Sequence, residues 1–312
     1  MVEIEVRALR PEELESWFDV ASRLSGQPRS RFVNSWEGDP HRMQGGIVIA
    51  KEGEQILGGL RIFAREIYLG GVPVMVGGVG DLYAEQPEEE LTATLVDEAI
   101  RFMGRRSMAA SLIFSPDPQR YAAHGWKPVP MEMVLSRLPV DAGEEPYDSA
   151  PANPRDPAEA RQMQVIYEGL ARHHQGAVKR ADLSYWTGWL SDQWELALIG
   201  RKNGRPAGYL AAHWAAPDEL HVQDFAALPG EATDLFQALV RAMARERSLE
   251  SVRVKYPLAL QLDLEVEERQ VDPTPMYRVI QPPLLPLPSA RALDEMLRGE
   301  CSTHLIWPAD WF

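Results

Sequence analysis

Cysteine is nearly absent from this chain of 312 residues, which contains Cys301 alone. A single cysteine can form neither an intrachain disulfide nor a thiolate metal cluster, so we expect no metal site and a reducing, cytoplasmic location. No run of eighteen or more apolar residues occurs, so the sequence predicts no membrane-spanning helix and no membrane partner. The first residues, MVEIEVRALRPEE, also lack the basic flank and apolar stretch of a signal peptide.

Basic residues are the minority among the charged side chains. The chain has 32 Lys and Arg against 46 Asp and Glu, which gives a formal net charge of −14. No run of Lys or Arg is long enough to follow a phosphate backbone, so we expect no nucleic-acid partner. An acidic protein attracts cationic small molecules, although a net charge often serves only to keep a protein in solution.

The apolar residues of the first half follow strand and helix periods in a fixed order. Residues 46–65 predict a hairpin, and a second hairpin turns at Leu69-Gly70-Gly71-Val72 into a strand that ends near Leu82. Residues 88–106 carry apolar side chains at helical spacing, which predicts a helix with one buried stripe. A short strand at 111–115, a short helix at 119–123 and a last strand at 129–138 follow.

The second half repeats this order. A hairpin at 194–214, a strand through His221 to Phe225, a helix through Leu235 to Met243 and a strand at 252–256 match the first half at an offset of about 145 to 150 residues. We therefore predict a domain at 1–140, a proline-rich linker at 141–157, a second domain at 158–281 and a tail at 282–312. The tail is expected to hold a helix at 290–298 and a strand at 304–307.

Three phrases carry a family resemblance: GGLRIFAREIYLGGVPVMVGGVGDLYAEQPE, RYAAHGWKPVP and IYEGLARHHQGAVKR. They resemble the tandem-GNAT N-acetyltransferases of the enhanced-intracellular-survival type, over roughly residues 1–281. The resemblance implies an α/β fold with mixed sheets and two tandem GNAT (acyl-CoA N-acyltransferase) domains, without the C-terminal sterol-carrier-like domain of longer members. It also implies transfer of an acetyl group from acetyl-CoA to a small, cationic amine, and it is compatible with a homo-oligomer.

The same resemblance implies roles for individual residues. Tyr121 matches the family's tyrosine general acid, because a phenol with an ordinary pKa near 10 can protonate a leaving thiolate. The alternative is that the Tyr121 ring packs beneath the turn at Gly125-Trp126. Asp81, Glu132 or the terminal carboxylate of Phe312 is a candidate for the base. Backbone N–H groups near Leu82 and Tyr83, with the helix start at Glu88, Leu91 and Thr92, correspond to the coenzyme-binding segment.

The helix start departs from the family pattern. Family members have the pattern arginine or glutamine, two intervening residues, glycine, one residue, and glycine or alanine here. The backbone N–H groups of this segment bind the pyrophosphate of CoA. This chain has Gln86-Pro87-Glu88-Glu89-Glu90 instead, in a loop about three residues shorter and without glycine. Proline and acids suit a helix start, yet glutamates repel a diphosphate.

Three interpretations therefore stay open. The chain is an acyltransferase that binds CoA through other contacts, for which Arg101, Arg105 and Arg106 are candidates. Alternatively, it is a catalytically inactive tandem GNAT that binds a small molecule or a protein in the interdomain cleft, or it is a scaffold without a ligand.

Overall fold

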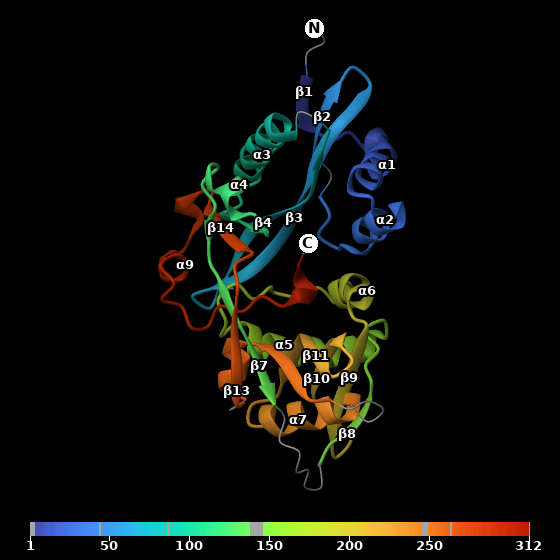
Figure 1. Ribbon diagram of the computed structural model, residues 1–312, viewed down its shortest axis with the longest axis vertical. Coiled ribbons are helices and arrows are strands. Elements are labelled where there is room, and N and C mark those ends of the chain that lie inside the picture. Colours follow the sequence, from blue (N-terminus) through green and yellow to red (C-terminus); the bar gives the residue numbers. More distant parts are fainter. Residues whose placement is uncertain are drawn as a thin grey trace.

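The computed structural model describes residues 4–43, 45–85, 88–137, 146–244, 249–262 and 264–311. Two seven-stranded sheets lie one above the other in Figure 1, each covered by helices. The described C-terminal end lies between the two sheets, near the centre of the molecule. The predicted mixed α/β class with two similar units is confirmed.

The first sheet has the strand order β1-β2-β3-β4-β5-β14-β6. Helices α1 (Leu14–Ser25) and α2 (Arg29–Gly38) lie on one face, and α3 (Glu88–Arg105) lies on the other (Figure 1). A 3-10 turn η1 (Pro11–Glu13) precedes α1, and α4 (Pro118–Ala122) follows β5. The strands are β1 (Ile4–Ala8), β2 (Ile47–Glu52), β3 (Gln55–Leu69), β4 (Val72–Ala84), β5 (Ala110–Phe114), β6 (Lys127–Pro128) and β14 (Pro275–Val279).

Helix α3 forms where the apolar spacing predicts it. Its stripe packs against the first sheet, with Leu95, Val96 and Met103 at most 1% exposed. Burial of each such side chain stabilises the fold by roughly 1.5–3 kcal/mol. Gly77 on β4 permits this close approach, because a Cβ at that position would lie 2.4 Å from the Met103 sulfur.

The second sheet has the order β13-β7-β12-β11-β10-β9-β8. As in the first sheet, an antiparallel run ends in a parallel pair joined by a helix: β4 pairs with β5 across α3, and β11 pairs with β12 across α7. The strands are β7 (Met131–Arg137), β8 (Asp148–Pro151), β9 (Leu196–Lys202), β10 (Arg205–Ala216), β11 (Glu219–Ala227), β12 (Ser251–Lys255) and β13 (Val266–Asp272). The helices of this half are α5 (Pro157–Ala171), η2 (Tyr185–Leu190), α6 (Ser191–Gln193), α7 (Ala232–Met243) and α8 (Tyr256–Gln261).

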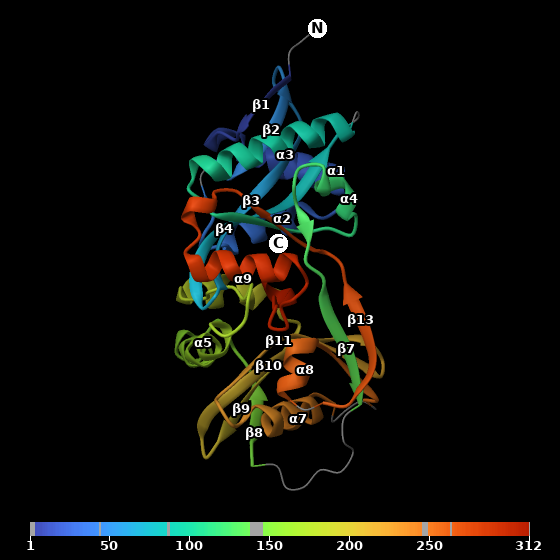
Figure 2. The same cartoon turned by 90° about the vertical axis from the view of Figure 1, so that its left-hand side faces the viewer.

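The two halves exchange a strand. The strand expected at 129–138 is present as β7, but it pairs with β12 and β13 of the second sheet, and Figure 2 shows β7 beside β13. In return, β14 pairs with β5 and β6 of the first sheet. Each sheet therefore needs residues from both halves of the chain to be complete.

The segments around the predicted linker and tail differ in part from expectation. Residues 148–151 of the predicted linker form β8, an edge strand of the second sheet. The helix predicted at 290–298 is α9 (Leu287–Leu297), which follows η4 (Pro282–Leu284). The strand predicted at 304–307 is wrong, because His304 forms only an isolated bridge with Gln175 and a turn η5 (Pro308–Asp310) follows. The domain boundaries themselves stay a prediction.

Candidate active site

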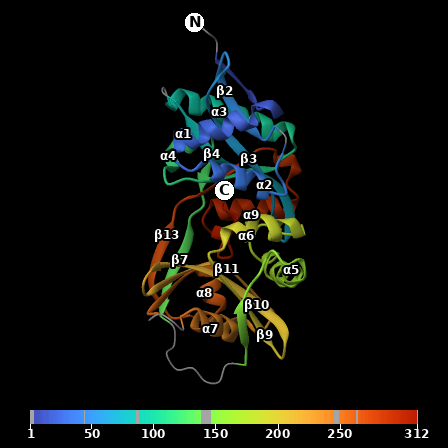
Figure 3. The same cartoon turned by 90° about the vertical axis from the view of Figure 1, so that its right-hand side faces the viewer.

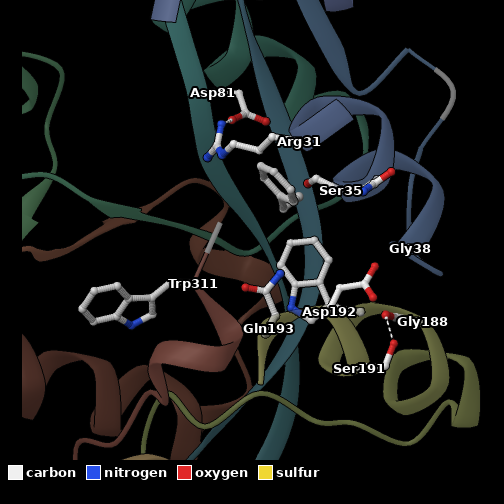
Figure 4. Close-up of a pocket in the computed structure, with 12 residues that line it drawn as sticks. Arg31, Ser35, Gly38, Asp81, Gly188, Ser191, Asp192, Gln193 and Trp311 are labelled. Carbon is white, nitrogen blue, oxygen red and sulfur yellow. Dashed lines mark hydrogen bonds and ion pairs between the residues drawn. The ribbon is translucent and has the colours of Figure 1, made fainter. Parts of the chain in front are cut away.

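A cavity of about 770 Å³ opens between the two halves of the chain. Helix α2, strands β3 and β4, the segment η2–α6 and the end of the chain all contribute to its wall, and Figure 4 shows their side chains around it. The lining residues are Arg31, Asn34, Ser35, Gly38, Phe63, Asp81, Gly188, Trp189, Ser191, Asp192, Gln193 and Trp311. Two carboxylates and three aromatic rings therefore surround the space, together with one guanidinium.

Two glycines bring the halves together at this cavity. A Cβ on Gly188 would lie 2.8 Å from the carbonyl oxygen of Gly38, so a larger residue would push η2 away from the end of α2. Figure 3 shows α2 directly above α6 on this side of the molecule. Segment η2 is a π-helix, a rare conformation that occurs frequently at functional sites.

Asp81 sits on a β-bulge at the edge of the cavity. Gly80 pairs with Arg61 and Tyr83 pairs with Gly59, so two residues of β4, Asp81 and Leu82, oppose one residue of β3. The φ angle of Asp81 is 48°, a left-handed conformation that Asp tolerates better than most residues. The parallel pairing of β4 with β5 ends just before the bulge, at Val79 and Ile113. Among the residues that the structure describes, β4 and β5 have no paired residues beyond that point.

The Asp81 carboxylate is held by a partner from α2. Arg31 Nη1 lies 3.2 Å from Asp81 Oδ1 and 3.4 Å from the Tyr83 hydroxyl oxygen. The Asp81 side chain is 7% exposed, whereas Arg31 is 49% exposed and reaches solvent. Burial raises the pKa of Tyr83 above its ordinary value, and the Asp81 charge raises it further, so the phenol stays protonated.

A buried charge network supports the cavity wall from behind. Arg61 donates to Ser35 Oγ at 3.0 Å and to Asp39 Oδ2 at 2.8 Å, and Arg65 donates to Asp39 Oδ1 at 3.0 Å. Burial lowers the pKa of Arg61 to about 10, still high enough to keep the guanidinium charged at neutral pH. Asp39 directly follows α2, so the network fixes the end of that helix against β3.

The end of the chain forms part of the same wall. Trp311 stacks on Phe114, the last residue of β5, with ring centroids 5.0 Å apart. Trp189 of η2 donates to the Ala309 carbonyl at 3.0 Å, and Arg180 binds both carboxylate oxygens of Asp310. Phe312 lies outside the described residues, but its neighbour Trp311 lines the cavity with Asp81. Arg180 ends the phrase IYEGLARHHQGAVKR, but sequence reasoning gave it no role, because its partner Asp310 lies 130 positions away.

Tyr121 is packed into the core of the first half. The residue is 8% exposed, and its ring meets Trp126 edge-on with centroids 6.4 Å apart. The backbone N–H of Trp126 also donates to the Tyr121 carbonyl at 3.3 Å. These contacts are those of the packing alternative, while the general-acid role stays a prediction.

The start of α3 lies next to a basic residue that sequence reasoning did not single out. Leu91 and Thr92 are each 4% exposed, so neither side chain is open to a ligand. Arg120 Nη2 of α4 donates to Thr92 Oγ1 at 2.9 Å, which brings a guanidinium to the residue that follows the first turn of α3. Glu89 and Glu90 are exposed there, and the side chain of Glu88 lies outside the described part. Arg120 is 28 positions from Thr92, so no local motif could reveal the contact.

Other candidates from the sequence lie elsewhere. Arg101 and Arg105 both bind Glu98, and Arg106 lies over Phe102. At 1.5 Å per residue these arginines are roughly 18–25 Å along the helix from its first turn, too far to contact a phosphate there. Glu132 is on β7 of the second sheet, in the wall of a different cavity.

Within the described ranges, no helix combines the length and apolar character needed to cross a bilayer. The same residues include no group of three or more His, Cys, Asp or Glu side chains placed to hold a metal ion.

The first half of the chain is similar to a known family of acyltransferase domains. Residues 5–129, which include the bulge, match the family model of the Acetyltransferase (GNAT) domain. This match covers less than half of the chain. None of the curated proteins compared with the chain matches it.

Solved structures extend the likeness to most of the chain. A conserved protein of unknown function from Enterococcus faecalis, a probable N-acyltransferase, is 14% identical with a TM-score of 0.73, covering 91% of this chain and 74% of that one. A GCN5-related N-acetyltransferase from Kribbella flavida is 17% identical with a TM-score of 0.70, covering 91% and 72%. Eis1 from Mycobacterium abscessus is 15% identical with a TM-score of 0.62, covering 88% and 74%. At these identities the likeness shows the fold, and it extends over both sheets of the chain.

Proposed function

We propose that this GNAT-containing chain is an N-acyltransferase that moves an acetyl group from acetyl-CoA to a small, cationic amine in the cavity at Asp81. One observation carries the proposal: β4 and β5 stop pairing at the point where the bulge brings Asp81 to the cavity. A thioester lying between the separated strands would be reachable from the cavity. The comparisons support acyl transfer as the general reaction.

The acceptor class is inferred from the cavity wall. Asp81 and Asp192 supply negative charge, and Trp189, Trp311 and Phe63 supply aromatic faces that attract cations. Asp81 already pairs with Arg31, and Asp192 pairs with Arg155 at 2.6 Å, so an ammonium group would compete with these guanidinium groups or bind beside them. The acidic net charge of the chain would favour the approach of such a molecule.

The residues around the strand gap fit acetyl-CoA in part. The bulged end of β4, with the backbone of Leu82 and Tyr83, offers N–H and C=O groups that β5 does not pair. The first turn of α3 offers further backbone N–H groups, which can bind phosphates, and Arg120 lies nearby at Thr92. Glu89 and Glu90 oppose this, because each would repel a diphosphate by roughly 1 kcal/mol at contact distance in water. We therefore expect acetyl-CoA to bind, but one or more decades more weakly than without these charges.

Acetyl-CoA would supply an activated acyl thioester, and the chain would handle the protons. Asp81 would hold the incoming ammonium group and accept its proton, so that the free amine can react. The terminal carboxylate of Phe312 is a second candidate for this base, since Trp311 lies in the cavity wall. Tyr121 would donate its phenol proton to the leaving thiolate, because a phenol is neutral at physiological pH.

A second candidate function is ligand binding without catalysis. Two observations favour a site that no longer binds CoA. Glu89 and Glu90 are exposed at the start of α3, and the Thr92 hydroxyl already accepts a hydrogen bond from Arg120. In that case the cavity would bind a small molecule in the interdomain space without transferring a group to it. The two functions differ in one measurable property, the affinity for acetyl-CoA.

Isothermal titration with acetyl-CoA separates the two. We would compare the wild type with the double variant Glu89→Gln/Glu90→Gln. Glu265→Gln/Glu268→Gln is the matched control, because it removes two exposed carboxylates near the edge strand of the second sheet. The proposal predicts measurable wild-type binding, about tenfold tighter in the α3 variant and unchanged in the control.

Each other result has a distinct meaning. Binding by the α3 variant alone would mean that charge has disabled the site and would favour the second function. No binding by any of the three proteins would contradict the acetyl-CoA proposal.

A further inference from the structure

A second cavity, of about 490 Å³, lies in the other half of the molecule. Strands β7, β10, β11, β12 and β13 line it, together with the end of the chain. Trp311 belongs to its wall as well as to the wall of the first cavity. The proposed acyl transfer makes no use of this space.

The second cavity is built at the position that corresponds to the first. Ala211 pairs with Asp224 and Ala212 pairs with Val222, so Gln223 is the extra residue of a bulge in β11. The parallel pairing of β11 with β12 ends at His221 and Arg253, just before that bulge. Gln223 lines the second cavity as Asp81 lines the first, so a charged acid in one unit corresponds to an uncharged amide in the other.

The carboxylates at this cavity already have their hydrogen-bond donors. Asp272 Oδ1 accepts from the Thr274 N–H at 3.0 Å and from its hydroxyl at 2.7 Å, and Lys255 Nζ lies 3.3 Å from Oδ2. Glu219, behind the wall, accepts from Arg253 Nε at 2.9 Å and bonds His221 Nε2. Neither acid therefore needs a cationic ligand.

Several hydrogen-bond donors at this cavity, by contrast, have hydrogens without an acceptor among the described residues. The Trp311 indole N–H is buried and has no partner among the residues that the structure describes. Figure 4 shows this nitrogen on the edge of the ring that points away from Asp81 and Arg31. Lys255 is 1% exposed, and its ammonium lies over the Trp311 ring, 5.2 Å from the ring centroid. Among the described residues its three hydrogens have one carboxylate acceptor, Asp272 at 3.3 Å. A buried donor without an acceptor is costly, and a ligand could supply the acceptor.

One histidine adds a further donor. Gln223 Nε2 lies 2.7 Å from His213 Nδ1, and an amide that donates there requires Nδ1 to accept. With Nδ1 as the acceptor, Nε2 carries the N–H of the ring and can donate it to a ligand. The rest of the wall is largely apolar, with Met133, Val222, Pro273 and Pro308.

We propose that this second cavity binds a small organic carboxylate. Lys255, His213 and the Trp311 N–H would bind its oxygens, and its apolar body would lie against Met133 and Val222. The preference is opposite to that of the first cavity, where Asp81 and Asp192 favour a cation.

Benzoate is a suitable probe, with benzamide as a neutral molecule of the same shape. Ligand-observed NMR would measure the affinity of the full chain for both. We expect benzoate to bind at least about tenfold more tightly than benzamide. Lys255→Met should weaken benzoate binding by about tenfold or more, because it removes the charge but keeps the length of the side chain. Lys202→Met is the control, since Lys202 is 41% exposed and binds Glu231 away from both cavities.

Two further variants keep the test decisive. Trp311→Phe keeps an aromatic ring but removes the N–H, and it should weaken benzoate binding even if Lys255→Met fails to fold. Asp81→Asn alters only the first cavity and should leave benzoate binding unchanged. The proposal is overturned if benzoate fails to bind at about 10 mM, if benzamide binds equally well, or if Trp311→Phe has no effect. Loss of benzoate binding in Asp81→Asn, or displacement of benzoate by acetyl-CoA, would also overturn it.

Discussion

Arg180 binds Asp310 through two hydrogen bonds, of 2.9 and 2.7 Å, across 130 positions of sequence. Arg180 Nη1 also bonds Asp224 of β11, and all three side chains are fully buried. One guanidinium therefore fastens the end of the chain to the second sheet. That attachment brings Trp311 to the wall that the two cavities share.

Loss of this guanidinium should destabilise the fold strongly. Arg180→Met leaves two carboxylates buried without a counter-charge, and we expect the free energy of unfolding to fall by about 3–5 kcal/mol. Denaturant unfolding measures the change. Arg291→Met is the control, because Arg291 is 79% exposed where it meets Glu295, and its loss should cost less than about 1 kcal/mol. Equal effects of the two substitutions would contradict the assigned role of Arg180.

Asp81 should affect the acceptor rather than the coenzyme. In Asp81→Asn we expect kcat/KM for the amine to fall by about 100-fold, with the Kd of acetyl-CoA unchanged, because the amide cannot accept the proton. Asp19→Asn in α1 removes an exposed carboxylate of the same kind, which binds Arg29, and should leave both constants unchanged. A weaker coenzyme affinity with normal turnover in Asp81→Asn would show that Asp81 has another role.

Tyr121 can be tested for chemistry and packing separately. Tyr121→Phe keeps the ring against Trp126, so thermal stability should change little. If the phenol supplies the proton for the thiol, the rate should fall by about 10²-fold or more, and the alkaline limb of the pH–rate profile should disappear. An unchanged profile would leave Tyr121 with the packing role alone.

His304 should make the protein sensitive to acid. Burial lowers its pKa to about 3, and its Nδ1 has no partner within the described part of the chain. Because the unfolded histidine has the higher pKa, it binds a proton first as the pH falls. The stability from neutral His304 is therefore full above the unfolded pKa and is lost as the pH falls towards the folded value.

Unfolding at two pH values measures this contribution. From about pH 7.5 to about pH 5, His304 should account for a loss of about 2 kcal/mol, which His304→Leu should remove from the pH dependence. His173→Leu is the control: it removes an exposed histidine elsewhere in the chain and should leave the pH dependence of stability as in the wild type. A wild-type slope in His304→Leu would exclude this origin.

The spacing of apolar residues predicted the helices and strands that bury one face of their own. The stripe from Leu91 to Met103 specified α3, because one face of a helix repeats every three to four residues. The same reasoning could not predict that β7 enters the second sheet. A buried strand has the same alternation in either sheet, and its partner is chosen by long-range packing.

Only the site residues that lie on one strand were predicted from the sequence. Asp81 and Tyr83 lie on β4 and were singled out from a continuous phrase. The cavity also needs Arg31 from α2, Gly188 from η2 and Trp311 from the chain end, which no spacing relates to one another. Arg120 and Arg180 act through partners 28 and 130 positions away, so only the folded chain reveals them.

Product formation tests the central claim most directly. The wild-type chain would be incubated with acetyl-CoA and a panel of primary amines of increasing positive charge, and mass spectrometry would detect the acetylated amine. Acyl transfer at the Asp81 cavity predicts enzyme-dependent product, greatest for amines with more than one positive charge and strongly reduced in Asp81→Asn. Absence of product with every amine from folded protein, at acetyl-CoA concentrations that saturate any binding, would contradict the claim.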